Sequence, residues 1–165
     1  MTLTDLSNGI VSGEGVVTAA RTVGDLAGYW ADAESAVAVK DRPLYRTYAW
    51  NHSQEAGAIL WGSTVLHPGR VGNEFSMTRG HRHTDVTKGE LMITVSGTGW
   101  LLLKDDQGVE TRERLAPGST HHVDGRLAHR AVNDGDEPLV FLTAWDVGCG
   151  HDYESVLPWP GVSVE

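Results

Sequence analysis

Two histidines and a glutamate lie close together in the stretch RGHRHTDVTKGE, residues 79–90. His81 and His83 are two residues apart, and on an extended strand that spacing puts both side chains on one face, with Cα atoms about 6.6 Å apart. Glu90 begins the next expected strand, and His129 offers a third imidazole later in the chain. Three imidazoles and one carboxylate suit a divalent transition metal (Fe, Mn, Ni, Co or Zn) and do not suit calcium. These residues therefore predict a site for one metal ion per chain, with coordination positions left for vicinal oxygens of a substrate.

Other histidines compete for the role of metal ligand. An HxH pair on a strand is, by itself, more often a surface or hydrogen-bonded pair than a metal site, and the added glutamate and downstream histidine are what favour a metal. His121 and His122 are adjacent, so on a strand they point to opposite faces and at most one of them can enter a barrel. His52 and His67 lie in expected loops and are interpreted as solvated. Three other residues are by default interpreted as buried packing residues: Met92, Trp145 and Cys149.

The segments that must position these side chains are nearly all strands. Short runs with β-branched or aromatic residues alternate with Gly, Pro, Asn or Asp, which predicts a sandwich or barrel. Within residues 89–95, Glu90, Met92 and Thr94 share one face, so Glu90 can face the inside of a barrel. One short helical segment is expected within residues 23–32. The expected strands cover residues 43–50, 57–66, 73–83, 89–99, 100–106, 110–116, 119–125, 127–133 and 137–145.

The length and composition of the chain indicate a single folded domain. The chain has 165 residues, of which 40% are hydrophobic and 21% are charged, and it contains one cysteine. That length suffices to bury a core without disulfides. We expect a loosely held arm over residues 1–20, the folded domain over residues 21–157 and a C-terminal tail over residues 158–165.

Charge and hydropathy exclude several classes of partner. The net charge of -9 argues against nucleic acid, because affinity for nucleic acid rests on Lys and Arg side chains that neutralise phosphates. No apolar run approaches the length of about 18 residues that would suggest a membrane span. The N-terminus MTLTDLSNGIVSG lacks the features of a signal peptide, so we expect a cytoplasmic protein. The overall negative field would repel a phosphate ester, so local amides and hydroxyls would have to bind it.

Several longer motifs resemble one family, the cupin-type phosphoglucose isomerases. The motifs are TRGHRH with its following glutamate, GTG, AHRAVNDGDEPLVFL and GHDY, together with the earlier segments TVGDLAGYWAD, PLYRTYAW and TVLHPGRVGNEF. The resemblance runs from residue 21 to residue 155. It implies an all-β, single-domain jelly-roll cupin that forms a homodimer. It also implies a metal-dependent isomerase that interconverts glucose 6-phosphate and fructose 6-phosphate.

The resemblance also assigns roles to individual positions. It implies that Glu90 is both a metal ligand and the base that moves a proton between the first two carbons of the sugar. A metal-assisted hydride shift needs no base and is equally compatible with the sequence. The implied metal ligands are His81, His83, Glu90 and His129. The implied substrate-side residues are Tyr45, together with a phosphate-binding group made of Thr64, Thr78, the backbone at Gly80, His151 and Tyr153.

Two positions on the substrate side depart from the family pattern. Met92 and Trp145 both stand where the family usually has tyrosine. Each lost hydroxyl removes a hydrogen-bond partner that typically contributes on the order of 0.5–1.5 kcal/mol. Three alternatives therefore stay open. One is an isomerase or epimerase for a modified sugar phosphate, the second is a metal-loaded cupin that binds a sugar phosphate without turnover, and the third is an Fe(II) dioxygenase, in which GHDY and the threonines would have no role.

Overall fold

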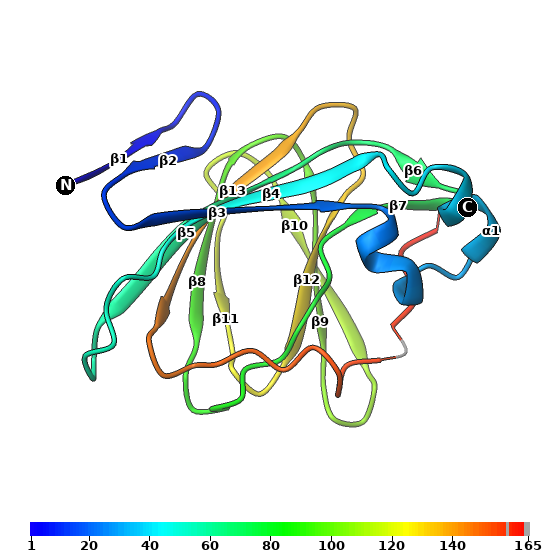
Figure 1. Cartoon of the computed structure of the whole chain (residues 1–165). Helices are drawn as coiled ribbons and strands as arrows, with labels where there is room; N and C mark the ends of the chain where they lie inside the picture. The colour runs from blue at the N-terminus through cyan, green and yellow to red at the C-terminus, as the bar shows by residue number, and fades with distance from the viewer. Residues whose placement is uncertain (158, 164–165) are drawn as a thin grey trace.

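The computed structural model describes residues 1–157 and 159–163 and consists mainly of antiparallel strands (Figure 1). Two short helical elements interrupt the strands, a 3-10 helix η1 (Gly24–Tyr29) and an α-helix α1 (Ala33–Ala38). The strands are β1 (Thr2–Asp5), β2 (Ile10–Gly13), β3 (Val16–Thr22), β4 (Pro43–Trp50), β5 (Ile59–Leu66), β6 (Arg70–Val71), β7 (Glu74–Met77), β8 (Glu90–Ser96), β9 (Gly99–Lys104), β10 (Glu110–Leu115), β11 (Thr120–Val123), β12 (Ala128–Asn133) and β13 (Leu139–Asp146).

Two large sheets form the barrel seen in Figure 1. The six-stranded sheet has the order β11-β8-β13-β5-β4-β3, and the five-stranded sheet has the order β10-β9-β12-β7-β6. All neighbouring strands in these sheets pair antiparallel, and most neighbours are distant in sequence, which is the pattern of a jelly roll. The all-β fold with a short helical segment near the N-terminus is therefore confirmed.

The core lies between the two sheets and follows the alternation expected from the sequence. In β8, Glu90, Met92 and Thr94 are buried while Leu91 is 42% exposed, so the inward face of this strand is the predicted one. In β12 every residue is buried, because the C-terminal segment covers the outer side of that strand. Cys149 is likewise buried and unpaired, and its burial raises the pKa of its thiol to about 11.

One expected strand differs from the structure in a way that matters for the metal ligands. Residues 73–83 were expected to form a single strand, but β7 ends at Met77. Gly80 has a φ of 74°, in the left-handed region that ends a strand, and His81 and Arg82 make only isolated bridges, to His129 and Asp152. The side chains of His81 and His83 are therefore positioned by a turn.

The N-terminal residues form three strands. Strands β1 and β2 make a separate two-stranded sheet, and β3 pairs with β4 at the edge of the six-stranded sheet. The arm expected over residues 1–20 therefore corresponds to β1, β2 and most of β3. The β-branched run at Val16 and Val17 was the signal in the sequence for β3.

The segment that follows β13 runs back along the barrel toward the C-terminus (Figure 1). Of the tail expected over residues 158–165, positions 158 and 164–165 lie outside the described residues, whereas Trp159 is 3% exposed and packs against the five-stranded sheet. Across the described residues, no helix has the length and apolar character needed to cross a membrane.

Candidate metal centre

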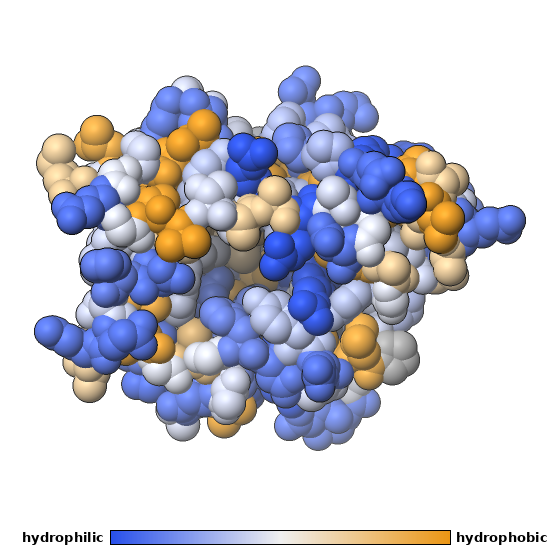
Figure 2. Space-filling view, in the orientation of Figure 1, coloured by the Kyte–Doolittle hydropathy of each residue, from blue (hydrophilic) through white to orange (hydrophobic). Residues whose placement is uncertain are grey.

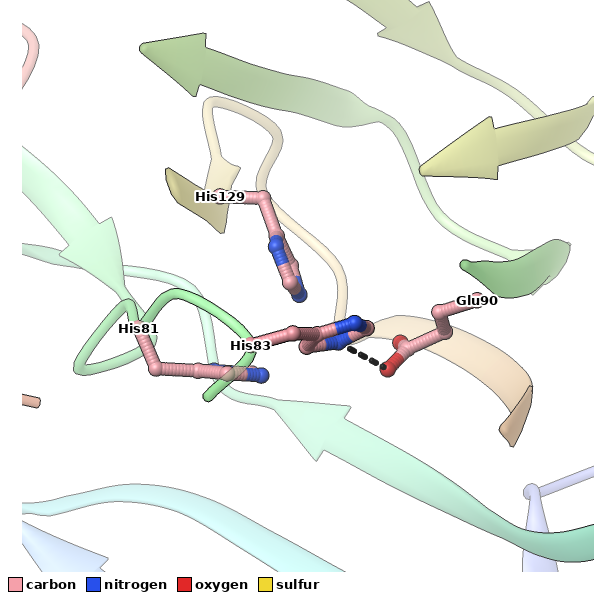
Figure 3. A group of neighbouring side chains, drawn as sticks. All are labelled: His81, His83, Glu90 and His129. Carbon is pink, nitrogen blue, oxygen red and sulfur yellow. Dashed lines mark ion pairs between the residues drawn. The ribbon is translucent and has the colours of Figure 1, made fainter. Parts of the chain in front are cut away.

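Four side chains converge on one point inside the barrel. His81, His83, Glu90 and His129 each offer a ligand atom, and these atoms lie within 4.8 Å of one another. Figure 3 shows the three imidazoles and the carboxylate pointing toward a common centre, with His81 and His83 on one loop and with Glu90 and His129 on other segments of the chain. These are the four metal ligands proposed from the sequence, and the structure brings all of them together.

Backbone pairing and local hydrogen bonds hold these side chains in place. His129 lies on β12, and its backbone exchanges two hydrogen bonds with His81, with N···O distances of 2.8 and 3.1 Å. The Nδ1 atom of His83 lies 2.6 Å from the carbonyl oxygen of Lys88, and Nδ1 of His129 lies 3.3 Å from that of Leu127. Because a carbonyl only accepts hydrogen bonds, both Nδ1 atoms must carry the proton. The lone pairs are then on the Nε2 atoms that face the centre.

The chemistry of these atoms fits a bound divalent metal. The Nε2 atoms of His81, His83 and His129 are buried and have no hydrogen-bond partner among the described residues. Their closest contact with an acid is a 3.7 Å approach of His83 Nε2 to Glu90 Oε2. Buried polar atoms are almost always paired, so three unpartnered ring nitrogens facing one carboxylate call for a cation. Nitrogen and oxygen donors in this ratio suit a transition metal.

The electrostatics of the cluster keep two of its imidazoles neutral. Burial lowers the pKa of His81 well below its ordinary value, and the neighbouring His129 and His151 lower it further. Burial also lowers the pKa of His129. For His83, burial lowers the pKa, but the nearby Glu90 carboxylate and the hydrogen bond to the Lys88 carbonyl outweigh it, and the net shift is upward. Neutral imidazole is the form that binds a metal, so His81 and His129 are prepared for that role.

A pocket of about 310 Å³ opens onto the metal cluster. Its walls come from β4, β5, β8, β12, β13, the turn after β7 and the segment after β13. His83 does not line the pocket, whereas every other site residue proposed from the sequence does. Those lining residues are Tyr45, Thr64, Thr78, Gly80, His81, Glu90, Met92, His129, Trp145, His151 and Tyr153.

The rival histidines do not join the metal cluster. His121 enters the barrel, as one of the adjacent pair was expected to, but its ring nitrogens bond Glu113 at 2.6 Å and Ser119 at 2.9 Å. His122 is exposed. His52 is an exposed loop residue, and His67 is half-buried in a loop.

Sequence reasoning missed a charged residue of the pocket, Arg79. It lines the pocket between Thr78 and Gly80, and its Nε donates a 2.8 Å hydrogen bond to the hydroxyl of Tyr29. The signal available in the sequence was its place inside the TRGHRH motif, next to two proposed phosphate-binding positions. Thr47 and Thr143 are further polar residues in the pocket walls that the sequence did not single out.

Comparison with known proteins finds one family over nearly the whole chain. A family model described as "Glucose-6-phosphate isomerase (GPI)" matches residues 20–164. The glucose-6-phosphate isomerase of Thermococcus litoralis is 34% identical over 155 residues, which cover 92% of this chain and 80% of the relative. The glucose-6-phosphate isomerase of Pyrococcus horikoshii is 35% identical over 155 residues, which cover 92% of this chain and 81% of the relative. A more distant relative of the same name, from Sinorhizobium medicae, is 30% identical over 144 residues, which cover 85% of this chain and 67% of the relative.

Solved structures with a similar backbone are cupins. Oxalate decarboxylase from Bacillus subtilis matches with a TM-score of 0.51 and 19% identity, over 73% of this chain and 27% of the decarboxylase chain. A recombinant oxalate oxidase in complex with glycolate matches with a TM-score of 0.51 and 11% identity, over 85% of this chain and 55% of the oxidase chain. The chain thus spans about a quarter and about half of these two proteins. At such identities the likeness shows the cupin fold alone.

Proposed function

The chain belongs to the glucose-6-phosphate isomerase family, and from that premise we propose that it interconverts glucose 6-phosphate and fructose 6-phosphate with the help of one divalent transition metal. The observation that carries this proposal is the convergence of three orphaned Nε2 atoms and one carboxylate at a pocket lined by hydroxyl groups. The proposed metal ligands are His81, His83, Glu90 and His129.

The chemistry divides between the ion and the side chains. A bound divalent ion supplies Lewis-acid polarisation of the substrate carbonyl, which acidifies the neighbouring C–H bond. Glu90 accepts the proton from C2 of the open-chain sugar and returns it to C1, while the hydroxyl proton passes from O2 to O1. No proton is gained or lost overall, as an aldose–ketose isomerisation requires. The alternative hydride shift would leave Glu90 as a ligand only.

The polar residues of the pocket provide the proposed substrate contacts. Thr64 on β5 and Thr78 after β7 carry hydroxyls that suit a phosphate, and Gly80 lines the same pocket. Tyr153 and His151 come from the segment after β13 and line the same pocket, as does Tyr45 on β4.

A second candidate function rests on Met92 and Trp145, which line the pocket beside Glu90. A thioether and an indole leave that wall with fewer hydrogen-bond acceptors than two phenols would. This favours, as the alternative, an isomerase or epimerase for a deoxygenated or otherwise modified sugar phosphate. A metal-loaded sugar-phosphate-binding cupin without turnover is the third outcome that the assay below distinguishes.

We also propose that the protein acts as a homodimer in the cytoplasm. Leu3 on β1, Leu6 in the turn after it and Ile10 on β2 are 62%, 64% and 39% exposed. Figure 2 shows hydrophobic side chains gathered at the end of the molecule where this sheet lies in Figure 1. A second copy covering these side chains would remove them from water.

The test is a coupled assay of fructose 6-phosphate conversion to glucose 6-phosphate. Chelator-stripped protein should be inactive, and protein reloaded with Fe(II), Mn(II), Ni(II) or Zn(II) should regain activity with at least one ion. If metal binds stoichiometrically and no ion restores turnover, the proposed reaction is wrong. A panel of other sugar phosphates then separates the modified-sugar isomerase, which turns one over, from the binding protein, which is only stabilised thermally by one of them.

A further inference from the structure

The pocket contains an arginine whose charge is not balanced by a carboxylate. Two arginines line the pocket, Arg79 and Arg130. The Arg130 guanidinium donates to the carbonyl oxygens of Trp159, at 2.7 Å, and Pro160, and it lies 4.4 Å from the Trp159 ring centroid. Arg130 is thus committed to the C-terminal segment. Arg79 forms no ion pair with an acidic side chain of the described residues, so its charge is available to the pocket.

Three aromatic side chains surround Arg79. Its guanidinium lies 4.5 Å from the ring centroid of Tyr153 and 5.6 Å from that of Tyr29, and both rings present their faces to it. The hydrogen bond that Arg79 Nε donates to Tyr29 raises the pKa of the guanidinium, which stays charged. Tyr45, the third aromatic residue, lies close to the backbone N–H of Arg79. Nε is used by Tyr29, so the two terminal nitrogens of the fork remain for a ligand.

Tyr29 reaches Arg79 from outside the barrel. It is the last residue of η1 and is 6% exposed, and its hydroxyl also donates to the backbone carbonyl of Tyr153 at 3.3 Å. One phenol therefore connects the N-terminal 3-10 helix, the turn after β7 and the segment after β13. Its contacts fix the direction of the Arg79 side chain, although Tyr29 itself is not part of the pocket wall.

We propose that Arg79 is the residue that binds the anionic group of the substrate through its two terminal nitrogens, and that Tyr29 is the positioning residue that orients it. This inference rests on the proposed function, since it names the charge that a sugar phosphate needs in a protein of net charge -9. A phosphate is the class that fits, because hydroxyls of Thr64 and Thr78 line the same pocket as a guanidinium fork. Without such a cation, a dianion would enter a pocket that already holds Glu90.

The test measures binding of inorganic phosphate to the metal-loaded protein by titration calorimetry. Arg79→Gln should weaken phosphate binding by about 10- to 100-fold, since it removes a charge-assisted fork. Arg79→Lys should recover only part of the affinity, because an ammonium lacks the planar pair of donors. Arg70→Gln is the matched control, because Arg70 also stacks on an aromatic ring, 4.9 Å from that of Phe75, but does not line the pocket. It should bind phosphate as the wild type does.

The positioning role of Tyr29 is tested by comparing the effect of Tyr29→Phe in the wild type and in the Arg79→Gln variant. Tyr29→Phe should weaken phosphate binding by about 3- to 10-fold, the size expected when one neutral hydrogen bond is lost. In the Arg79→Gln background the same change should have no further effect, which a general loss of structure would not reproduce. Equal weakening by Tyr29→Phe in both backgrounds would overturn the positioning role.

The outcomes separate this inference from the isomerase itself. In an active enzyme, Arg79→Gln should raise the KM for glucose 6-phosphate by about 10- to 100-fold. If phosphate binding depends on Arg79 and no sugar phosphate is turned over, the inference holds and the proposed reaction fails. If Arg79→Gln binds phosphate as tightly as the wild type, or the wild type does not bind phosphate at all, the inference is wrong whatever the activity.

Discussion

Trp145 is the cross-strand partner of Glu90 in the pairing of β13 with β8. Directly paired residues on antiparallel strands have Cβ atoms about 4.5–5.5 Å apart and share one face, so the indole lies beside the carboxylate that is proposed to move the proton. Both side chains line the pocket. An indole offers one N–H donor and no acceptor, so the wall next to Glu90 is less polar than a phenol would make it.

Replacing this indole by a phenol tests whether the pocket is built for a fully hydroxylated sugar. We expect Trp145→Tyr to raise kcat/KM for glucose 6-phosphate by about 2- to 10-fold, since one recovered hydrogen bond contributes on the order of 0.5–1.5 kcal/mol. Trp61→Tyr is the control, because Trp61 stacks on Trp50 at 4.3 Å outside the pocket and should leave the kinetics unchanged. A lower kcat/KM in Trp145→Tyr would favour the modified-sugar alternative.

The role of Glu90 as a base is tested by removing its charge and keeping its shape. Glu90→Gln should lower kcat by about 10²- to 10⁴-fold, the usual contribution of general acid–base catalysis. Wild-type turnover in deuterated water should place deuterium at the carbon that receives the proton. Full turnover by Glu90→Gln, with no solvent label in the product, would mean that a hydride shift operates and that Glu90 only binds the metal.

The assignment of His129 as a metal ligand is tested with His121, a buried histidine outside the metal cluster, as the control. His129→Ala should reduce metal affinity by at least about 100-fold, because it removes one donor from a set of four. His121→Ala removes an imidazole that bonds Glu113 and Ser119, so it should lower stability and leave metal content unchanged. The measurement is metal analysis after dialysis against a limiting chelator. Equal metal loss in both variants would contradict the assignment of His129.

The lowered pKa values of the buried imidazoles predict a pH-dependent stability in the metal-free protein. His81 and His129 have pKa values below the ordinary 6.5 in the folded state, so below that pH the unfolded chain binds more protons than the folded chain. These two imidazoles therefore lower the free energy of unfolding as the pH falls, against the opposite and single contribution of His83, whose pKa is raised. We expect the Tm of chelator-treated protein to decrease between about pH 7 and about pH 5, and to decrease less steeply in His129→Ala. An unchanged slope in the variant would show that other groups cause the loss.

Three of the four metal ligands, His81, His83 and Glu90, were readable from the sequence because short-range spacing sets them. His81 and His83 were expected on a strand and are held by a turn at Gly80, but their side chains still converge, since one bridge to His129 fixes the backbone there. Glu90 follows the period of two of its strand, which every inward residue of β8 obeys. Local rules therefore sufficed for His81, His83 and Glu90, whereas His129 is brought to them by pairing between distant segments.

The contacts around Arg79 and Trp159 could not be predicted in the same way. The hydrogen bond from Arg79 to Tyr29 joins residues 50 positions apart, and that from Trp159 to Glu110 joins residues 49 apart. No periodicity in the sequence connects such pairs, because they form only after both sheets have assembled. The pairing of β3 with β4 was missed for a related reason, since an edge strand is recognised by its neighbour more than by its own composition.

Trp159 gives the last prediction, which concerns stability. Its indole is 3% exposed, donates a 2.7 Å hydrogen bond to Glu110, and lies between the Lys104 amine at 4.6 Å and the Arg130 guanidinium at 4.4 Å from its ring centroid. Trp159→Ala should lower the free energy of unfolding by about 3–5 kcal/mol, because it opens a cavity and exposes Arg130 beside the metal ligand His129. Denaturant unfolding of metal-free protein measures this change.

The neighbouring Leu157 separates loss of this packing from a general effect of altering the C-terminal segment. Leu157 is 42% exposed, and Leu157→Ala should change the free energy of unfolding by less than about 0.5 kcal/mol. Trp159→Phe should lie between the two alanine variants, because it keeps an aromatic face for Lys104 and Arg130 while it loses the N–H bond to Glu110 and part of the buried ring volume. If Trp159→Ala unfolds at the same denaturant concentration as Leu157→Ala, the packing of Trp159 does not stabilise the barrel. The strands alone would then keep Arg130 buried.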